Sequence, residues 1–193
     1  IDTLIYKVKQ RWSSLFNLTD GLVEEWAGCF YGKRIKLATR NAAYCGSVLG
    51  SEATVRTLSL SDARELEAFF MKLPKESFIY FKPHGFSTKD ITSILTSKRF
   101  LAYGVFVKDG LIAYSILKLY PGRKAYFGRI IDPKFSGKGI GKFLSVYLQW
   151  QCKLMKLRMR GTINLENKPS VGSHLSVGGF EILGPLPGGY TLI

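Results

Sequence analysis

Apolar residues near the start of the chain recur at helical spacing, over residues 4–16 and again after Asp20. Asp20 stands in a capping position before Leu22 and Trp26. We therefore expect two amphipathic helices that pack on the main body of the protein, with binding to a membrane surface as the alternative. Two glycines within residues 44–51 then predict a connector.

The chain next shows short strands and helices in regular succession. A strand over residues 55–60 precedes a helix that Ser61 caps. An aromatic-rich loop follows over residues 74–86. Ser87 and Asp90 then have the spacing of a capping box, which predicts the start of a second helix.

The central part of the chain predicts three consecutive antiparallel strands. They cover residues 100–108, 111–120 and 124–131, and the first two are joined by the hairpin turn Asp109-Gly110. A glycine-rich loop follows the third strand directly. Because these turns are so short, no helix fits between the strands, which excludes a doubly wound parallel sheet.

The last third of the chain predicts a helix over residues 140–155, a strand over 159–165, a short helix over 170–177 and closing strands over 180–183 and 190–193. A strand meander followed by a strand–helix–strand crossover indicates an α+β fold. We expect a mixed, mostly antiparallel central sheet of about six or seven strands, with helices on both faces.

Composition changes this picture mainly through charge. The chain of 193 residues has a net charge of +14, which favours anionic partners. Its basic residues are scattered and match no nucleic-acid module, so nucleic-acid binding stays an alternative in which affinity falls steeply with salt. No apolar run is long enough to span a membrane, and residues 1–9 lack a signal-peptide core. Three cysteines without metal spacing indicate a cytoplasmic protein with no metal site.

The segment between the third central strand and the long helix carries the strongest chemical signal. Asp132-Pro133 ends the strand, and the alternate glycines Gly137, Gly139 and Gly141 lead into the helix. Glycine permits a positive φ and a close approach of the backbone to a ligand. Unpaired amides and the positive end of the helix dipole then form a cradle for an anion such as a pyrophosphate.

Two other phosphate-binding motifs do not fit the spacing. A Walker loop needs Gly-Lys followed by Ser or Thr, but Gly141-Lys142 is followed by Phe143. A Rossmann fingerprint needs G-x-G-x-x-G, whereas the glycines here alternate from Gly137, and the preceding strand belongs to a meander. The cradle is therefore of another kind.

The segment I-I-D-P-x-x-S-G-K-G-I-G-K-F-L, which begins at Ile130, resembles the acetyl-CoA motif of the GNAT superfamily, V-x-P-x-x-R/Q-G-x-G-I-G-x-x-L. A looser match to the second motif of that family runs from Asn167 to the Gly-Phe pair at residues 179–180. The resemblance covers residues 53–193 and implies a GNAT-like acyltransferase domain there. Residues 1–52 then form an N-terminal helical extension packed on the core.

The resemblance implies that the chain transfers an acetyl group from acetyl-CoA to an amine of a small molecule by direct nucleophilic attack. In the family, the pyrophosphate of CoA binds the amides of the glycine-rich loop, and the pantetheine arm binds the exposed backbone of the preceding strand. A backbone N–H of that strand polarises the thioester carbonyl. The implied cofactor-binding residues are Arg129, Ile130, Ile131, Ser136, Gly137, Lys138, Gly139, Ile140, Gly141, Lys142 and Asn167.

This sequence departs from the family pattern at two positions. Ser136 replaces the usual Arg or Gln, so pyrophosphate affinity depends more on lysines such as Lys138 and Lys142. The tyrosine that commonly reprotonates the CoA thiolate is also missing, because Leu175 occupies its position. His174, one residue earlier, is the candidate general acid, with a packed or solvent-facing histidine as the alternative.

The sequence says least about the amine that accepts the acetyl group. Within the aromatic loop, Glu76 is the candidate general base, and an exposed glutamate in an ion pair is the alternative. The ring-rich loop fits a sugar-like acceptor, and the basic charge favours an anionic one. A catalytically silent GNAT-like domain that binds CoA or an anionic partner is the alternative to an enzyme. Both a monomer and a homodimer stay open.

Overall fold

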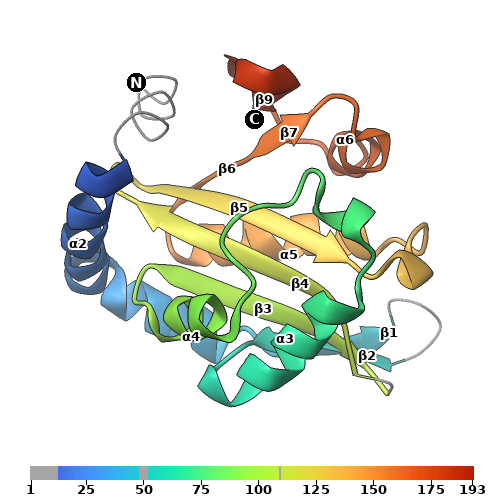
Figure 1. The fold of residues 1–193 in the computed structure, drawn as a ribbon, viewed down its shortest axis with the longest axis horizontal. Coiled ribbons are helices and arrows are strands. Elements are labelled where there is room, and N and C mark those ends of the chain that lie inside the picture. Colours follow the sequence, from blue (N-terminus) through green and yellow to red (C-terminus); the bar gives the residue numbers. More distant parts are fainter. Residues whose placement is uncertain (1–12, 48–51, 109) are drawn as a thin grey trace.

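Figure 1 shows a central sheet with helices on both faces and a small second sheet beyond one edge. The structure is a computed structural model that describes residues 13–47, 52–108 and 110–193. The central sheet has six strands in the order β1-β2-β3-β4-β5-β6; the first five pair antiparallel, and β6 pairs parallel with β5. They are β1 (Tyr44–Ser47), β2 (Glu52–Thr57), β3 (Phe100–Val107), β4 (Gly110–Tyr120), β5 (Lys124–Ile131) and β6 (Arg158–Arg160).

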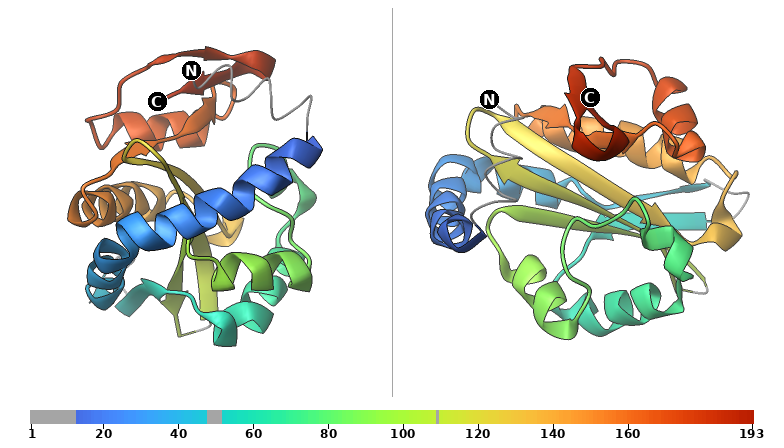
Figure 2. Two further views of the ribbon diagram at one scale, coloured as in Figure 1. Left: turned by 90° about the vertical axis from the view of Figure 1, so that its left-hand side faces the viewer. Right: turned by 45° about the horizontal axis from the view of Figure 1, so that its top comes forward.

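The second sheet has three strands in the order β7-β9-β8. These are β7 (Thr162–Asn164), β8 (Gly184–Leu186) and β9 (Tyr190–Leu192). The helices are α2 (Ser13–Arg40), α3 (Ala63–Lys72), α4 (Thr88–Thr96), α5 (Ile140–Leu154) and α6 (Lys168–Leu175), with short 3-10 turns η1 (Leu60–Asp62), η2 (Lys75–Phe78), η3 (Pro133–Phe135) and η4 (Pro187–Gly189). Figure 2 shows α6 and the small sheet side by side beyond the edge of the central sheet.

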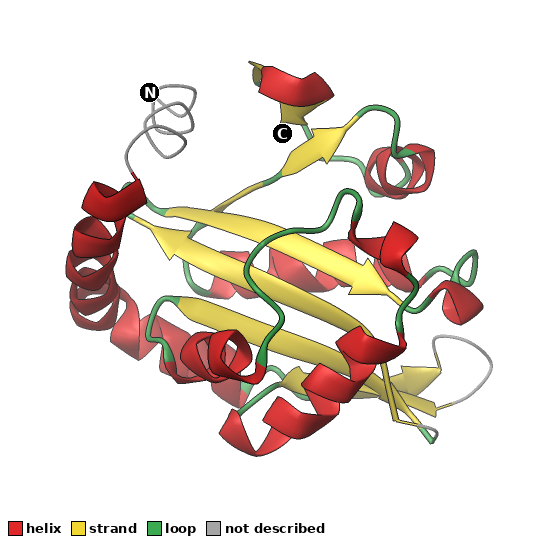
Figure 3. Ribbon diagram, in the orientation of Figure 1, coloured by secondary structure: helices red, strands yellow, loops and turns green. Residues whose placement is uncertain are grey.

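Two hydrophobic cores lie on opposite faces of the central sheet. Leu117 of β4 packs with Leu144 of α5 in one core, which also receives α2. Its neighbour Ile116 packs with Phe70 of α3 and Ile91 of α4 in the other. Successive side chains of a strand point to opposite faces, so β4 is apolar almost throughout. Figure 3 shows helices on both faces of the central sheet, and together with the strand order this confirms the predicted α+β fold with a mostly antiparallel sheet.

The described part of the N-terminal region forms one long helix, so the predicted helix start at Asp20 is wrong. Helix α2 continues through Asp20 because no proline interrupts it and isolated glycines in a helix cost only about 1 kcal/mol each. Ala27, Tyr31 and Ala38 of α2 are buried in the core that α5 also joins. Most of the first predicted helix, residues 4–12, lies outside the described residues.

The predicted connector over residues 44–51 is partly a strand. Its first four residues form β1, which pairs with β2 from Tyr44 opposite Val55, while residues 48–51 lie outside the described part. Strand β1 therefore belongs to the central sheet although it precedes residue 53. The division of the chain into residues 1–52 and 53–193 stays a prediction.

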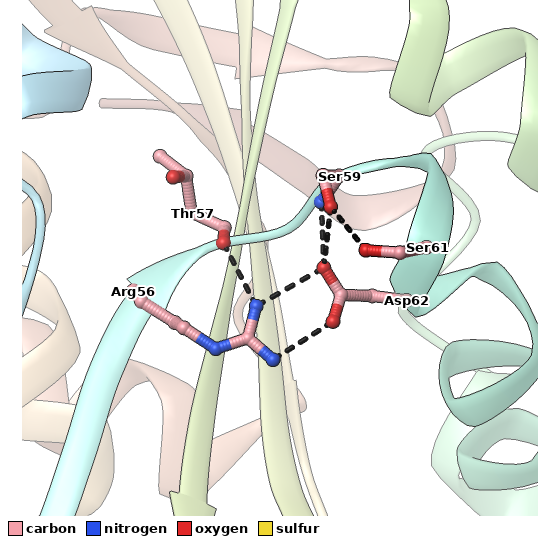
Figure 4. A network of polar contacts seen from close by, with 5 residues as sticks. All are labelled: Arg56, Thr57, Ser59, Ser61 and Asp62. Atoms are coloured by element: carbon pink, nitrogen blue, oxygen red, sulfur yellow. Dashed lines mark hydrogen bonds and ion pairs between the residues drawn. The ribbon is translucent and has the colours of Figure 1, made fainter.

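The start of α3 is held by an ion pair that Figure 4 shows. The guanidinium of Arg56 donates two hydrogen bonds to the Asp62 carboxylate, at 3.0 and 2.8 Å, and Asp62 also accepts from the Ser59 backbone N–H at 2.7 Å. These bonds hold the pKa of Asp62 below its ordinary value. Ser59 is the N-cap residue of η1, the 3-10 turn that leads directly into α3, so the expected cap at Ser61 is wrong. The preceding strand ends at Thr57.

Of the remaining predictions of helices and strands, some are confirmed and one is wrong. The capping box of Ser87 and Asp90 is confirmed, and β5 has the predicted bounds. Strands β3 and β4 are present, although Asp109 of the predicted turn lies outside the described residues. The strand predicted over residues 180–183 is wrong, because Gly178 and Gly179 both turn the chain with a positive φ and pairing resumes at β8.

Candidate functional site

The central feature of the site is a break between two neighbouring strands. Strands β5 and β6 pair only from Lys124 to Tyr126. At Gly161 the chain leaves β5: the Gly161 N–H donates to the carbonyl of Ile193 at 3.0 Å, and the Ile193 N–H donates back at 2.9 Å. Strand β7 then pairs with β9 in the second sheet. The strand predicted over residues 159–165 is therefore two strands, and the second half of β5 has an open edge.

The position of this break follows from the residue at its apex. A Cβ atom at Gly161 would overlap the ring of Phe127, so only glycine fits against that ring. The Phe127 ring also packs on His174 and Phe180, with centroids 5.2 and 6.1 Å away. Aromatic packing therefore fills the apex, where β6 gives way to β7.

The open edge presents backbone groups at alternate residues. The Asp132 N–H donates to the Ile112 carbonyl of β4 at 2.9 Å, and the register between β4 and β5 is continuous. In an antiparallel pair the backbone groups of alternate residues point to opposite sides. The N–H and C=O groups of Phe127, Arg129 and Ile131 therefore point away from β4, where an extended ligand can pair with them.

The glycine loop, which we define as residues 136–142, has the geometry that its sequence predicts. Gly137 and Gly139 have φ values of 75° and 81°, and an added Cβ at either would meet no atom within 4 Å. Helix α5 begins at Ile140, directly after Gly139. The amides at the start of a helix have no carbonyl partner within the helix, so residues 140–142 present N–H donors at an open surface.

Positive charge surrounds the glycine loop. Lys134, Lys138 and Lys142 are exposed and form no ion pair within the described residues. The Asp132 carboxylate, in contrast, is buried: it accepts from the Lys134 backbone N–H at 3.0 Å and pairs with the Lys72 ammonium at 3.2 Å. Asp132 therefore positions the chain at the end of β5 and leaves the lysines available to an anion.

A groove of about 1200 Å³ connects these features. Its walls come from the loop around η2, the second half of β5, the glycine loop, β7 and α6. Every residue that the sequence analysis assigned to catalysis or cofactor binding lines this groove, except Lys138. The groove is therefore the candidate active site.

The side chain of Arg129 is partly buried in the site and contacts both α5 and α6. One terminal nitrogen of its guanidinium donates to the carbonyl of Gly141 and to the hydroxyl of Ser145, and the other donates to the hydroxyl of Ser173 and to Nε2 of His174. Burial lowers the pKa of Arg129 to about 10. Sequence analysis selected Arg129 for its backbone only, and nothing in the pattern marked the two serines as its partners.

His174 does not have the environment of a general acid. A guanidinium can only donate, so Nε2 of His174 accepts from Arg129 at 3.0 Å and the ring proton is on Nδ1. Burial, and then the neighbouring positive charge of Arg129, lower the pKa of His174 to about 3. The imidazole is therefore neutral near pH 7, and the predicted acid role conflicts with this structure; the packed histidine is the interpretation that fits.

Asn167 lines the groove from the start of α6, and Glu76 lines it from η2. The Asn167 side-chain oxygen caps α6 by accepting from the Ser170 backbone N–H at 3.3 Å. Its predicted contact with CoA stays a prediction. Glu76 lies in η2 with its carboxylate exposed, and within the described residues it forms no ion pair. The alternative of a salt-bridged glutamate thus finds no partner there.

The aromatic loop is held close against β5. A Cβ at Gly128 would lie 3.2 Å from the Phe81 ring, so glycine lets this ring approach the strand. His84 fixes the loop further: its Nδ1–H donates to the Gly85 carbonyl at 2.5 Å, and its Nε2 accepts from the Tyr114 hydroxyl at 2.9 Å. Sequence analysis missed Gly128, although a glycine inside a strand is a known sign of close approach.

Two further lysines line the acceptor end of the groove. Lys82 is exposed in the aromatic loop, and the Lys118 ammonium lies 5.3 Å from the Phe100 ring centroid and 5.5 Å from that of Tyr120. No motif marked either lysine, because their role depends on the fold. Within the described residues, no cluster of side chains could hold a metal ion, and no helix is long and apolar enough to cross a membrane.

Comparison with solved structures identifies the fold. The GNAT domain of S. lividans PAT has a TM-score of 0.70 at 16% identity and covers 79% of this chain and 95% of its own. Mycobacterium smegmatis RimJ in complex with CoA-disulfide gives 0.62 at 16% identity, covering 78% and 84%. Spermidine N-acetyltransferase from Vibrio cholerae in complex with CoA and spermine gives 0.57 at 20%, covering 73% and 94%.

These similarities establish that the chain has the GNAT fold, as the resemblance in its glycine-rich segment implied. No family model matches the sequence, and no curated protein matches it either. The fold is therefore shown by structure, and the chemistry must be argued from the site.

Proposed function

We propose that this protein is an acetyl-CoA-dependent N-acetyltransferase. The observation that carries the proposal is the continuity of the open edge of β5 with the glycine loop in one groove. The amides of residues 140–142 would bind a pyrophosphate, and the backbone of Phe127, Arg129 and Ile131 would pair with the pantetheine arm. Two solved structures with this fold contain CoA or its disulfide.

The residues along the groove divide the chemistry between them. Acetyl-CoA supplies the activated acyl group, whose reacting end lies near the apex of the open edge in this arrangement. A backbone N–H of the open edge there, that of Phe127 or Arg129, would stabilise the negative charge that develops on the thioester oxygen. Glu76 is the candidate base for the attacking amine, and because His174 is neutral, solvent would reprotonate the departing thiolate.

The acceptor end of the groove supports a small amine that also carries a negative charge or a sugar-like ring. Lys82 and Lys118 line the groove there together with Glu76, and Phe81 and Tyr120 supply ring faces. A positive field attracts anionic substrates and repels polycations. Amino acids and phosphorylated amino sugars would therefore be better acceptors than polyamines.

The test is release of free thiol from acetyl-CoA in the presence of a panel of amines. We expect release with anionic amines and little with spermidine. Glu76→Gln should lower kcat by about 10²-fold with little change in KM for acetyl-CoA, because it removes the base but leaves the cofactor site. Glu181→Gln is the matched control, since this exposed glutamate does not line the groove. CoA binding without thiol release from any amine would instead identify a silent domain.

A further inference from the structure

Arg129 is a partly buried cation that has no anion beside it. Within the described residues it forms no ion pair, and its four hydrogen-bond partners are all uncharged: the carbonyl of Gly141, the hydroxyls of Ser145 and Ser173, and the ring of His174. Removing a charge from water costs several kcal/mol, so buried charges in proteins are ordinarily paired. An uncompensated guanidinium therefore indicates an anionic ligand.

The guanidinium lies close to the glycine loop, on its inner side. It contacts the carbonyl of Gly141, the second residue of α5, and Ser145 one turn later, while Ser173 and His174 hold it from α6. Its charge thus lies within about one helical turn of the amides that begin α5. A charge that is partly shielded from water attracts an anion more strongly than exposed lysines do, since solvent and salt screen the lysines.

The hydrogen bonds of Arg129 determine how it can act. Each of its two terminal nitrogens already donates two bonds, to α5 or to α6. A ligand cannot receive those four donors unless the contacts between α5 and α6 break. The side chain is therefore suited to act through its charge, at a short distance, with its position fixed by the two helices.

Building on the proposed function, we propose that the Arg129 guanidinium is the internal counter-charge for the pyrophosphate of CoA, and that it determines affinity for this anion through its charge. The competing interpretation is a structural brace, in which Arg129 serves only to hold α6 against α5. The two interpretations differ in which substitution of Arg129 should preserve CoA affinity. Lysine keeps the charge and loses the fork of donors, whereas glutamine keeps donors and loses the charge.

The experiment is calorimetric titration of CoA and of ADP, which has a pyrophosphate but no pantetheine arm, into the wild type, Arg129→Lys and Arg129→Gln. We expect Arg129→Lys to bind both ligands within about threefold of the wild type and Arg129→Gln to bind both at least about tenfold more weakly. The deficit of Arg129→Gln should persist in added salt more than that of an exposed lysine variant, because a partly buried charge is screened less. Thermal unfolding of each variant confirms that it is folded.

A second variant removes the brace and keeps the charge. Ser145→Ala combined with Ser173→Ala deletes two acceptors of Arg129, and we expect CoA affinity within about threefold of the wild type. Equal loss in Arg129→Lys and Arg129→Gln, or a tenfold loss in the serine variant, would overturn the proposal in favour of the brace. Failure of the wild type to bind CoA would instead overturn the proposed function itself.

Discussion

His174 shows how one contact changes the chemistry available to a residue. A histidine near the proposed thioester site is ordinarily a candidate general acid, because its unperturbed pKa lies close to neutrality. Here Nε2 accepts from Arg129, and burial with the adjacent charge lowers the pKa of His174 to about 3. The neutral ring therefore packs α6 against Arg129 of β5.

This environment predicts how stability depends on pH. The pKa of His174 is lowered from 6.5 to about 3 on folding, so between these values the unfolded chain binds a proton that the folded chain does not. The contribution of the neutral His174 ring to stability is fully present above pH 6.5 and is lost as the pH falls toward 3. We expect a lower Tm at pH 5 than at pH 7, and a smaller difference in His174→Gln, which accepts from Arg129 without titrating. An unchanged difference in that variant would contradict the account; His84, whose pKa is also lowered by burial, accounts for a residual slope.

Asp62 gives a second prediction at the same scale. Asp62→Asn removes the charge-assisted bonds with Arg56 and weakens the bond to the Ser59 N–H that holds η1 before α3, so we expect a loss of about 1–2 kcal/mol in the free energy of unfolding, measured in urea. Its pKa is held below 3.8, so this contribution is present above that pH and is lost as the pH falls through the folded value. Glu65→Gln, at an exposed carboxylate on α3, should change stability by less than about 0.5 kcal/mol.

Among the elements, the strand that changes partner at Gly161 determines the site. We expect Gly161→Ala to cost about 1–3 kcal/mol in unfolding free energy and to weaken CoA binding, because its Cβ would displace the Phe127 ring from the apex. Gly172→Ala is the matched control: it lies in α6 with no atom within 4 Å of an added Cβ, so it should leave stability unchanged or raise it by up to about 1 kcal/mol. Equal effects of the two variants would show that the apex is not tightly packed.

Features that depend only on residues close in sequence could be predicted from the sequence. The bounds of β5, the capping box at Ser87 and the positive φ of Gly137 and Gly139 each follow from residues within one turn or strand. The break at Gly161 could not be predicted, because it depends on a ring that is distant in sequence and on pairing with the C-terminal strand. Arg129 lies on β5 and its side-chain partners lie on α5 and α6, and no local pattern brings these elements together.

Across the whole molecule, charge and fold act together. The net charge of +14 alone is compatible with many anionic partners, including nucleic acid. The fold adds a groove in which the open edge of β5, the glycine loop and the partly buried guanidinium of Arg129 converge. The proposed cofactor has a partner for each of its parts in this groove: the glycine loop for the pyrophosphate and the open edge of β5 for the extended arm.

The decisive measurement is calorimetric titration of acetyl-CoA into the wild type and into Gly141→Asp. An aspartate at the second position of α5 suits the helix dipole, and a Cβ there would lie 3.5 Å from Ser173, so the variant should fold. Its carboxylate would enter the anion cradle, whereas Gln149→Glu adds the same charge farther along α5. We predict micromolar binding to the wild type and to Gln149→Glu, and at least about tenfold weaker binding to Gly141→Asp. Absence of binding to the folded wild type, or equal binding to all three proteins, would contradict the account.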